Sequence, residues 1–500
     1  MKYTTEFLLR HPVLWAKLLA SEPEAFWQKR GREMARRLFR NMERHVPAYK
    51  KYLAGHGERR GNGWEQIPIV SKDSYLRHYP LSELLWNGDF DHRQQTISAT
   101  SGSTGEPFYF PRTVEQDMQY AAIAEMYLRT NFYVHKKSTL YIIGWGMGIW
   151  IGGVFSYEAV RTLADRGTYP ISVITPGTSK EEILKAVQKL GPQFDQVLIG
   201  GYPPMIKDLV DAGERQGLVW KKYHCKFIFS AEGFTEAFRD YIARHAALGD
   251  IYRDTLNHYG TVDLGTMAHE TPVSILIRRL AVKNSKLNQK LFGQTRRQPT
   301  LAQYIPELFY FEEMNKTVIC SARSGIPLCR YDLVDTGGVL SFAAMRTMMM
   351  ECGIDPDKEI KKAGISDTVW NLPFVYVFER RDFTVKWQGA NIFPQEIRRA
   401  LESASLSRFC TGKCTMAISY DRGMEQRLVI DVELKTDVGM SDKLRVRIQT
   451  AIVRELLRSN SEYAYLYRQL SVQKMTPVIR CRECGTPPFD AKGKHPWVKK

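Results

Sequence analysis

The segment from about residue 95 to 270 alternates between short apolar runs and helix-like stretches, and this pattern constrains the fold most strongly. The apolar, β-rich runs are TLYIIGWG, YPISVIT, QVLIGG and KFIFSAEG. Between them lie SKEEILKAVQKLG, PPMIKDLVDAGERQG and FTEAFRDYIARHAALG, which are typical of helices. Strands that alternate with helices predict βαβ units and a mostly parallel sheet. Ligands of such sheets bind at the carboxyl ends of the strands.

The regions on either side of this segment predict further structure. Residues 1–60 show helical spacing of apolar residues, and residues 300–345 are β-rich. After residue 382, PQEIRRALES, CTMAISYD, RLVIDVELK and DKLRVRIQTAIVRELLRS predict a smaller α+β unit. We therefore predict an α/β protein of two domains. The large N-terminal domain spans 1–380, with a helical lead-in over 1–60, mostly parallel sheets and a β-rich subdomain. The small, mobile α+β domain spans 381–500.

The composition is that of a globular protein. Of the 500 residues, 44% are hydrophobic and 12% aromatic. No run of about 18 uninterrupted apolar residues is present, so we expect no membrane span. Charged residues interrupt the N-terminal segment, which argues against a secretory signal. Eight cysteines in such a length do not suggest a disulfide framework, and we predict a reducing, cytoplasmic location.

The formal net charge of +17 favours polyanionic partners. Part of this charge is local, because residues 271–300 contain no acidic residue and seven basic ones: Arg278, Arg279, Lys283, Lys286, Lys290, Arg296 and Arg297. The stretch is either a solvated helix face or, over 278–297, a docking patch for an acidic or phosphate-rich partner. It lies in one of two insertions, 271–300 and 338–370. Each insertion serves either a specialised acceptor or only the surface.

A hydroxyl-rich turn follows the strand-like QQTISA. It contains Thr100, Ser101, Gly102, Ser103, Thr104 and Gly105. Glycines expose backbone N–H groups without Cβ clashes, and hydroxyl groups add donors, so the turn suits phosphate oxygens. It lacks the Gly-Lys-Ser/Thr ending of a Walker A loop.

Further short motifs follow in order along the chain. They are Ser230–Gly233, Tyr259–Asp263, Arg330–Asp335, Arg380–Asp382, Gly389–Pro394 and Gly493-Lys494. Together with the hydroxyl-rich turn and the entry segment Ile67–Asp73, Tyr79-Pro80, they resemble the phenylacetate–CoA ligase branch of the adenylate-forming superfamily. The resemblance runs from about residue 40 to the end. It implies that ATP and Mg²⁺ activate a carboxylic acid as an acyl-AMP, and that the acyl group then passes to an acceptor, CoA by default.

The resemblance also implies a role for each motif. Thr100, Ser101, Ser103 and Thr104 would hold the β- and γ-phosphates. The remaining nucleotide contacts would come from Ala231, Glu232, Tyr259, Gly260, Asp335 and Arg380, with Asp335 on the ribose. Asp263 would bind Mg²⁺, and Asp382 would be the hinge. Lys494 would reach the α-phosphate and the carboxylate. A movable lysine fits this chemistry, because two anions react and their charge must be neutralised.

Two positions depart from the family pattern. Asp263 stands where the branch usually has glutamate, and Val262 where it has serine or threonine. The tail has one residue more than the expected spacing, so Lys492 is the alternative to Lys494.

The acid-binding pocket is predicted from the same resemblance. Trp145, Gly146, Tyr202 and Pro203 would form its wall and admit a flat or aryl acid, although these residues also suit plain core packing. Four cysteines of the C-terminal part, Cys410, Cys414, Cys481 and Cys484, are either ordinary thiols or a zinc site.

Two classes of function remain open. The first is an acyl-adenylate ligase, in which CoA, an amine, a hydroxyl or a carrier protein is the acceptor. The second is a non-catalytic protein of the same fold that binds partners through its basic surface. Nucleic acid is the less favoured partner.

Overall fold

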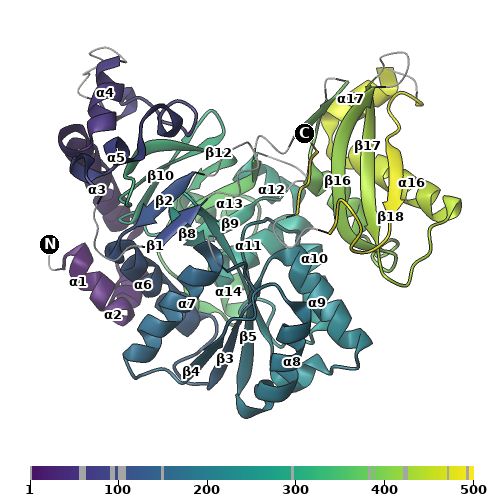
Figure 1. The fold of residues 1–500 in the computed structure, drawn as a ribbon, viewed down its shortest axis with the longest axis horizontal. Coiled ribbons are helices and arrows are strands. Elements are labelled where there is room, and N and C mark those ends of the chain that lie inside the picture. The colour runs from purple at the N-terminus through teal and green to yellow at the C-terminus, as the bar shows by residue number, and fades with distance from the viewer. Residues whose placement is uncertain are drawn as a thin grey trace.

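The computed structural model describes residues 3–55, 63–90, 96–99, 108–147, 151–293, 298–380, 384–388, 390–420, 426–469, 472–490 and 495–499. Its centre is an eleven-stranded sheet of order β10-β11-β12-β13-β9-β8-β7-β6-β5-β3-β4 (Figure 1). The strands are β3 (Thr139–Ile143), β4 (Ile171–Ile174), β5 (Gln196–Gly201), β6 (Lys226–Phe229), β7 (Thr255–Thr261), β8 (Gly265–His269), β9 (Thr300–Gln303), β10 (Phe309–Met314), β11 (Thr317–Ala322), β12 (Leu328–Leu340) and β13 (Phe374–Arg380).

The sheet has a parallel half and an antiparallel half. Strands β4, β3, β5, β6 and β7 pair in parallel, and β7 then pairs antiparallel with β8. The predicted α/β class is confirmed, and the strands from β3 to β7 are parallel as predicted, but the sheet as a whole is mixed. The β-rich region over 300–345 is the antiparallel half of this same sheet, continuous with the parallel strands.

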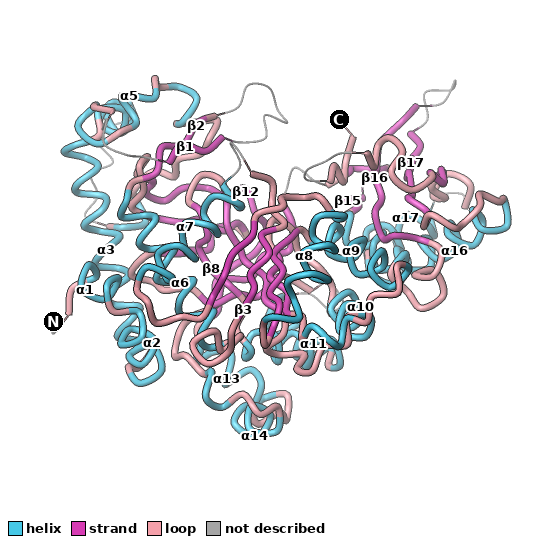
Figure 2. Tube along the Cα trace, turned by 60° about the horizontal axis from the view of Figure 1, so that its bottom comes forward, coloured by secondary structure: helices cyan, strands magenta, loops and turns pink. Residues whose placement is uncertain are grey.

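Helices cover both faces of the parallel half (Figure 2). Along β3, Tyr141 and Ile143 join the core beneath α6 and α7, whereas Leu140 and Ile142 join the core beneath α8, α9 and α10. This alternation follows from the two-residue period of a strand, and it explains the continuous apolar run. The helices are α6 (Val114–Thr130), α7 (Ile151–Asp165), α8 (Lys180–Leu190), α9 (Pro203–Arg215) and α10 (Glu236–His245).

The N-terminal region is helical, as its sequence indicates. It contains α1 (Thr5–Arg10), α2 (Pro12–Ser21), α3 (Glu24–His45), α4 (Pro47–Gly55) and α5 (Leu81–Leu84). Helix α3 lies on β10, β11 and β12. A Cβ at Gly31 would lie 2.7 Å from the Cβ of Pro306, so only glycine allows this close approach. The short hairpin of β1 (Thr96–Ala99) and β2 (Tyr109–Arg112) lies beside these helices (Figure 1).

The two insertions fold together. Helices α11 (Pro272–Lys283) and α12 (Ser285–Phe292) share one apolar cluster with α13 (Phe342–Glu351) and α14 (Pro356–Lys362). The sequence predicted a basic surface at 278–297. This prediction is wrong for Arg278, which is fully buried and paired with Glu270 and Glu236. Arg279 pairs with Asp240, and Lys290 with Glu351. Arg296 and Arg297 lie outside the described residues.

The C-terminal part has a core of its own. Residues from Val385 to Trp497 form a separate apolar cluster. Its elements are β14 (Val385–Trp387), β15 (Ala390–Ile392), α15 (Pro394–Leu401), β16 (Cys410–Tyr420), β17 (Gln426–Leu434), α16 (Asp442–Ser459), α17 (Ser461–Gln469) and β18 (Val478–Arg482). We call this part the C-terminal unit. The hinge at Asp382 falls in residues 381–383, which are not described, so the domain boundary stays a prediction.

None of the helices that the structure describes combines the length and the apolar character needed to cross a membrane.

Candidate active site

The parallel strands end at one edge of the sheet, and this edge collects most of the predicted site residues. Trp145 and Gly146 follow β3, Tyr202 and Pro203 follow β5, and Ala231 and Glu232 follow β6. Tyr259 and Gly260 form the end of β7. The parallel register of β3, β5, β6 and β7 is what brings these four segments of the sequence together.

The predicted acid pocket residues contact each other. The rings of Trp145 and Tyr202 meet edge to face, with centroids 5.5 Å apart. Burial raises the pKa of Tyr202; a backbone hydrogen bond from Gly146 opposes this rise, and the Glu232 carboxylate adds to it. Trp145 lies over β5, where a Cβ on Gly200 would be 2.9 Å from the indole Nε1. Glycine at position 200 is therefore required for the tryptophan to lie flat on the strand.

The turn after β6 has an unusual backbone. Ala231 has φ +72°, in the left-handed region that residues other than glycine rarely adopt. The side-chain amide of Asn257 donates to the Glu232 carbonyl at 3.2 Å and holds the next residue in place. Such strain persists where surrounding contacts enforce it, and it is frequent at binding sites.

Tyr259 and Asp335 join the two halves of the sheet. The Tyr259 hydroxyl donates to Asp335 Oδ2 at 2.6 Å, and both residues are buried. Asp335 lies in β12 and pairs in register with Arg380 of β13, whose side chain is not described. Val334, just before it, has φ +63°, a strained value for a β-branched residue. The Val334 N–H donates to Asp332 Oδ1 at 2.7 Å, so a side chain of the same segment stabilises this backbone conformation.

Asp263 lies among cationic and hydroxyl groups that the sequence did not identify. The Tyr331 hydroxyl donates to Asp263 Oδ2, and Lys72 Nζ lies 3.4 Å from Oδ1. Arg112 donates to the Val262 carbonyl next to it, and to Ser98 Oγ at 3.2 Å. Burial lowers the pKa of Arg112 to about 9, against the opposing effect of Asp117 and Asp263. Arg112 thus keeps its positive charge at neutral pH.

This environment fits an anion better than a metal ion. Each oxygen of Asp263 already has a donor or an ammonium group beside it. A divalent cation at the same carboxylate would be repelled by Lys72 and Arg112. Over the ranges that the structure describes, no three His, Cys, Asp or Glu side chains are placed to hold a metal. The zinc alternative at Cys410, Cys414, Cys481 and Cys484 gains no support from these ranges, and none of the four cysteines forms a disulfide.

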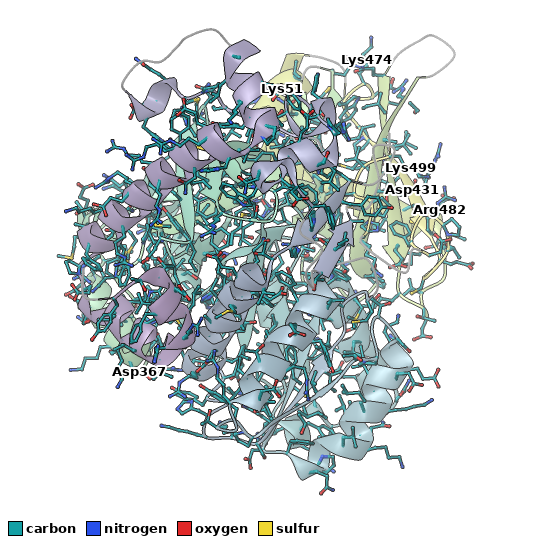
Figure 3. The ribbon with its side chains drawn as sticks, turned by 60° about the vertical axis from the view of Figure 1, so that its left-hand side comes forward. Lys51, Asp367, Asp431, Lys474, Arg482 and Lys499 are labelled. Atoms are coloured by element: carbon teal, nitrogen blue, oxygen red, sulfur yellow. The ribbon has the colours of Figure 1, made fainter. Side chains whose placement is uncertain are left out.

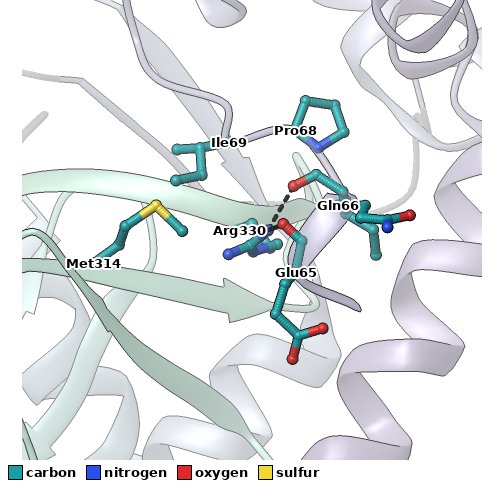
Figure 4. A pocket seen from close by; sticks show the side chains of 7 residues that line it. Glu65, Gln66, Pro68, Ile69, Met314 and Arg330 are labelled. Atoms are coloured by element: carbon teal, nitrogen blue, oxygen red, sulfur yellow. Dashed lines mark hydrogen bonds between the residues drawn. The ribbon is translucent and has the colours of Figure 1, made fainter. Parts of the chain in front are cut away.

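The segment that carries Lys72 is fixed to β12 by an arginine. Arg330 has φ +51° and donates to the carbonyls of Glu65 and Ile67 at 2.9 and 2.6 Å. A pocket of about 600 Å³ opens here between residues 65–69 and Met314 (Figure 4). Because the guanidinium is committed to backbone carbonyls, it positions the segment beside the site.

Several predicted site residues fall outside the described residues. They are the turn Thr100, Ser101, Gly102, Ser103, Thr104 and Gly105, the hinge Asp382, and the tail lysines Lys492 and Lys494. The described ends of the turn are informative, because β1 ends at Ala99 and Ser98 is bonded to Arg112. The strand before the turn is therefore held by Arg112.

Comparison with known proteins identifies the fold. No family model matches the chain, and no curated protein matches it. Among solved structures, 2-hydroxyisobutyryl-CoA ligase in the postadenylation state is similar over 97% of this chain and 91% of that one, with a TM-score of 0.64 and 14% identity. An acyl acid amido synthetase in complex with 2,4-DB is similar over 100% and 95%, with a TM-score of 0.60 and 12% identity. The chain has the fold of adenylate-forming enzymes.

Structures of 2-hydroxyisobutyryl-CoA ligase in two states match this chain to different extents. For 2-hydroxyisobutyryl-CoA ligase the TM-score against this chain falls from 0.64 in the postadenylation state to 0.53 in the thioesterification state, at 14% identity in both.

Proposed function

We propose that the protein is an AMP-forming acid ligase. It uses ATP to convert a carboxylic acid to an acyl-adenylate and then transfers the acyl group, with CoA as the default acceptor. The observation that carries this proposal is the buried bond between Tyr259 and Asp335 at the sheet edge where the predicted nucleotide residues meet. The adenylate-forming fold supports the same reading.

Each residue has a proposed part in this reaction. Asp335 accepts hydrogen bonds from the ribose hydroxyls, and Tyr259 holds its carboxylate in place. Lys72 and Arg112 neutralise phosphate charge next to the Thr100–Gly105 turn. Trp145, Gly146, Tyr202 and Pro203 form the acid pocket, and Ala231, Glu232 and Gly260 line the nucleotide. Arg380 stays a predicted nucleotide contact, and Lys494, or Lys492, the predicted catalytic lysine on the C-terminal unit.

Mg²⁺ has no step in this proposal, because Asp263 is already neutralised by its own neighbours. A cytoplasmic location stays a prediction from composition.

A second acceptor class is supported by one comparison. The amido synthetase named above matches the whole chain. An amine acceptor would give an amide in place of a thioester. The same acyl-adenylate precedes both products, so the first half-reaction tests the class and the second identifies the acceptor.

The test is a pyrophosphate-release screen over aryl, fatty and hydroxy acids, run without acceptor and then with CoA or amines. Acid-dependent pyrophosphate release supports the ligase. Its absence over the whole screen would contradict the proposal in favour of a non-catalytic binding protein.

Asp335→Ala tests the nucleotide site. Loss of a charged acceptor should weaken ATP binding by about 1.5–3 kcal/mol for each ribose hydrogen bond lost, which is at least tenfold in affinity. Tyr259→Phe keeps the ring and removes one donor to Asp335, so we expect a smaller loss. Calorimetric titration with ATP measures both. Unchanged ATP affinity in a folded Asp335→Ala variant would remove the ribose role.

A further inference from the structure

Polar groups connect the C-terminal unit to the rest of the chain. Its apolar cluster shares no residue with the clusters of the large sheet. Across the boundary, Thr235 donates to Glu402 at 2.7 Å, and Arg398 donates to the Gly233 carbonyl at 2.9 Å. Interfaces of this kind allow the parts of a chain to move relative to one another. The charges at this boundary therefore decide how firmly the unit is held.

Two lysines of the C-terminal unit meet two aspartates of helix α9. Asp208 and Asp211 lie one helical turn apart, on one side of α9. Lys413 Nζ of β16 lies 2.6 Å from Asp208, and Lys435 Nζ lies 3.3 Å from Asp211. Lys435 also donates to the Tyr241 hydroxyl at 3.1 Å. We call Asp208, Asp211, Lys413 and Lys435 the ionic clasp.

The members of the clasp are largely hidden from water. The side chains of Lys413 and Asp208 are each 14% exposed, and that of Asp211 is 9% exposed. Burial alone would lower the pKa of Lys413, but Asp208 and Glu433 outweigh it and raise the pKa. Breaking a buried ion pair is normally unfavourable by several kcal/mol, because a buried charge is left without its partner.

Here, however, separation leaves the main charges compensated. Lys413 has a second partner within its own unit, Glu433, at 3.2 Å. Asp211 has Lys207 at 3.0 Å and the Tyr241 hydroxyl at 2.6 Å on its own side. Asp208 has Lys180 at 3.9 Å, also on its own side. When the two parts separate, Lys413 and Asp211 each keep a close counter-charge, and Lys435 gains water.

We propose that the ionic clasp is a reversible positioning device, which holds the C-terminal unit against α9 for the first half-reaction and releases it for acyl transfer. The structure in which the clasp is closed has a TM-score of 0.64 against the postadenylation state of 2-hydroxyisobutyryl-CoA ligase and 0.53 against its thioesterification state, which supports this assignment. Its role in catalysis rests on the proposed ligase function. Its role in positioning the unit does not.

The structural test uses small-angle X-ray scattering of the full-length protein. Lys413→Met/Lys435→Met should increase the radius of gyration at low salt, because both cross-boundary ion pairs are lost. Raising NaCl from about 50 mM to about 500 mM shortens the Debye length about threefold and stabilises the charges that separation exposes more than the buried pairs, so the wild type should expand and the variant should change little. Lys413→Arg/Lys435→Arg keeps the charges and should restore the wild-type radius. Lys180→Met is the matched control, since Lys180 contacts Asp208 without crossing the boundary.

The kinetic test separates the two half-reactions. In the double Met variant, acid-dependent pyrophosphate release should fall about tenfold with the KM for ATP unchanged, because no clasp residue is a proposed nucleotide contact. Transfer from a pre-formed acyl-adenylate to the acceptor should not be slowed. A variant with the wild-type radius of gyration and salt response would overturn the clasp, whatever its activity. If the wild type itself releases no pyrophosphate, the ligase proposal fails while the scattering result still decides the clasp.

Discussion

The ionic clasp contrasts with a second charged network, inside the large part of the molecule. Arg239 and Arg278 bind Glu236 and Glu270 there, with Arg239 2.7 Å and Arg278 2.6 Å from Glu270. All four side chains are at most 4% exposed. Arg278 also donates to the Phe234 carbonyl at 2.6 Å, and the Asn257 N–H donates to Glu270 at 3.0 Å. This network thus braces the turn after β6 and the strand that carries Tyr259.

The difference between the two networks is where each charge finds its partners. In the buried network Arg239 and Arg278 neutralise Glu236 and Glu270, and the low exposure of these side chains leaves little room for water to replace a missing partner. Burial alone would raise the pKa of Glu236, but Arg239 and Arg278 outweigh it and lower the pKa. In the clasp, Lys413 and Asp211 each have a partner on both sides of the boundary. A charge of the buried network cannot lose its partners without being left uncompensated. Lys413 and Asp211 can separate from the other side of the boundary and still keep a counter-charge.

Arg278→Met should have the largest effect on stability. It removes a fully buried cation from the network, and a buried ion pair that loses one partner typically costs about 3–5 kcal/mol. Arg279→Met is the control on the same helix. Arg279 is 21% exposed and pairs with Asp240 at 2.8 Å and, at 3.3 Å, with Glu236 at the edge of the network, so its loss should cost only about 0–1 kcal/mol. Urea unfolding measures the free energy of unfolding of both variants. Similar losses in the two would show that the buried network stabilises the fold no more than a partly exposed ion pair does.

The duplicated partners of Asp211 predict an intermediate and non-additive effect. Lys207→Met and Lys435→Met each leave Asp211 one ammonium group, and each should cost about 1 kcal/mol or less. The double variant leaves a buried carboxylate with only the Tyr241 hydroxyl, and should cost about 2–3 kcal/mol, more than the sum. A double-mutant cycle by urea unfolding measures the coupling.

Acid pH should reduce the loss of stability in the Lys207→Met/Lys435→Met double variant. Burial alone would raise the pKa of Asp211, but Lys207, Tyr241 and Lys435 outweigh it and lower the pKa. The stability from the lowered pKa is present at neutral pH and disappears as the pH falls through it. The double variant should therefore approach the wild type at acid pH. Additive values at neutral pH would show that the two lysines are not alternative partners, and the clasp would lose its reversibility.

The large fold was predictable from the sequence because its signals are local. Apolar runs of strand length, separated by amphipathic helices, mark β3, β5, β6, α8, α9 and α10 without any knowledge of contacts. Tyr259 and Asp335 were found through their motifs. The bond between them was not, because β7 and β12 are separated by three other strands of the sheet. Lys72, Arg112 and Tyr331 were missed for the same reason.

Charge shows the limit of sequence reasoning most clearly. The basic stretch at 271–300 suggested a surface, yet Arg278 is buried because its acidic partners come from α10 and from the end of β8. The exposed arginines of α3 were not singled out. They are Arg32, Arg36, Arg37, Arg40 and Arg44. Figure 3 shows this side of the molecule, with Lys51 of α4 labelled. A count of charges gives no information on which of them the fold has already paired.

Arg36→Ser should have the smallest effect on stability. It extends the comparison from buried charges and charges at the boundary to a charge on the surface. Arg36 is exposed on α3, and Arg32 and Arg40 lie four residues to either side of it. Like charges at this spacing repel each other on a helix by a few tenths of a kcal/mol. Removing Arg36 should therefore change stability by no more than about 0.5 kcal/mol, in either direction, since serine is a weaker helix former. A loss as large as that of Arg278→Met in urea unfolding would mean that exposure does not separate these arginines, and the distinction between paired and unpaired charge would fail.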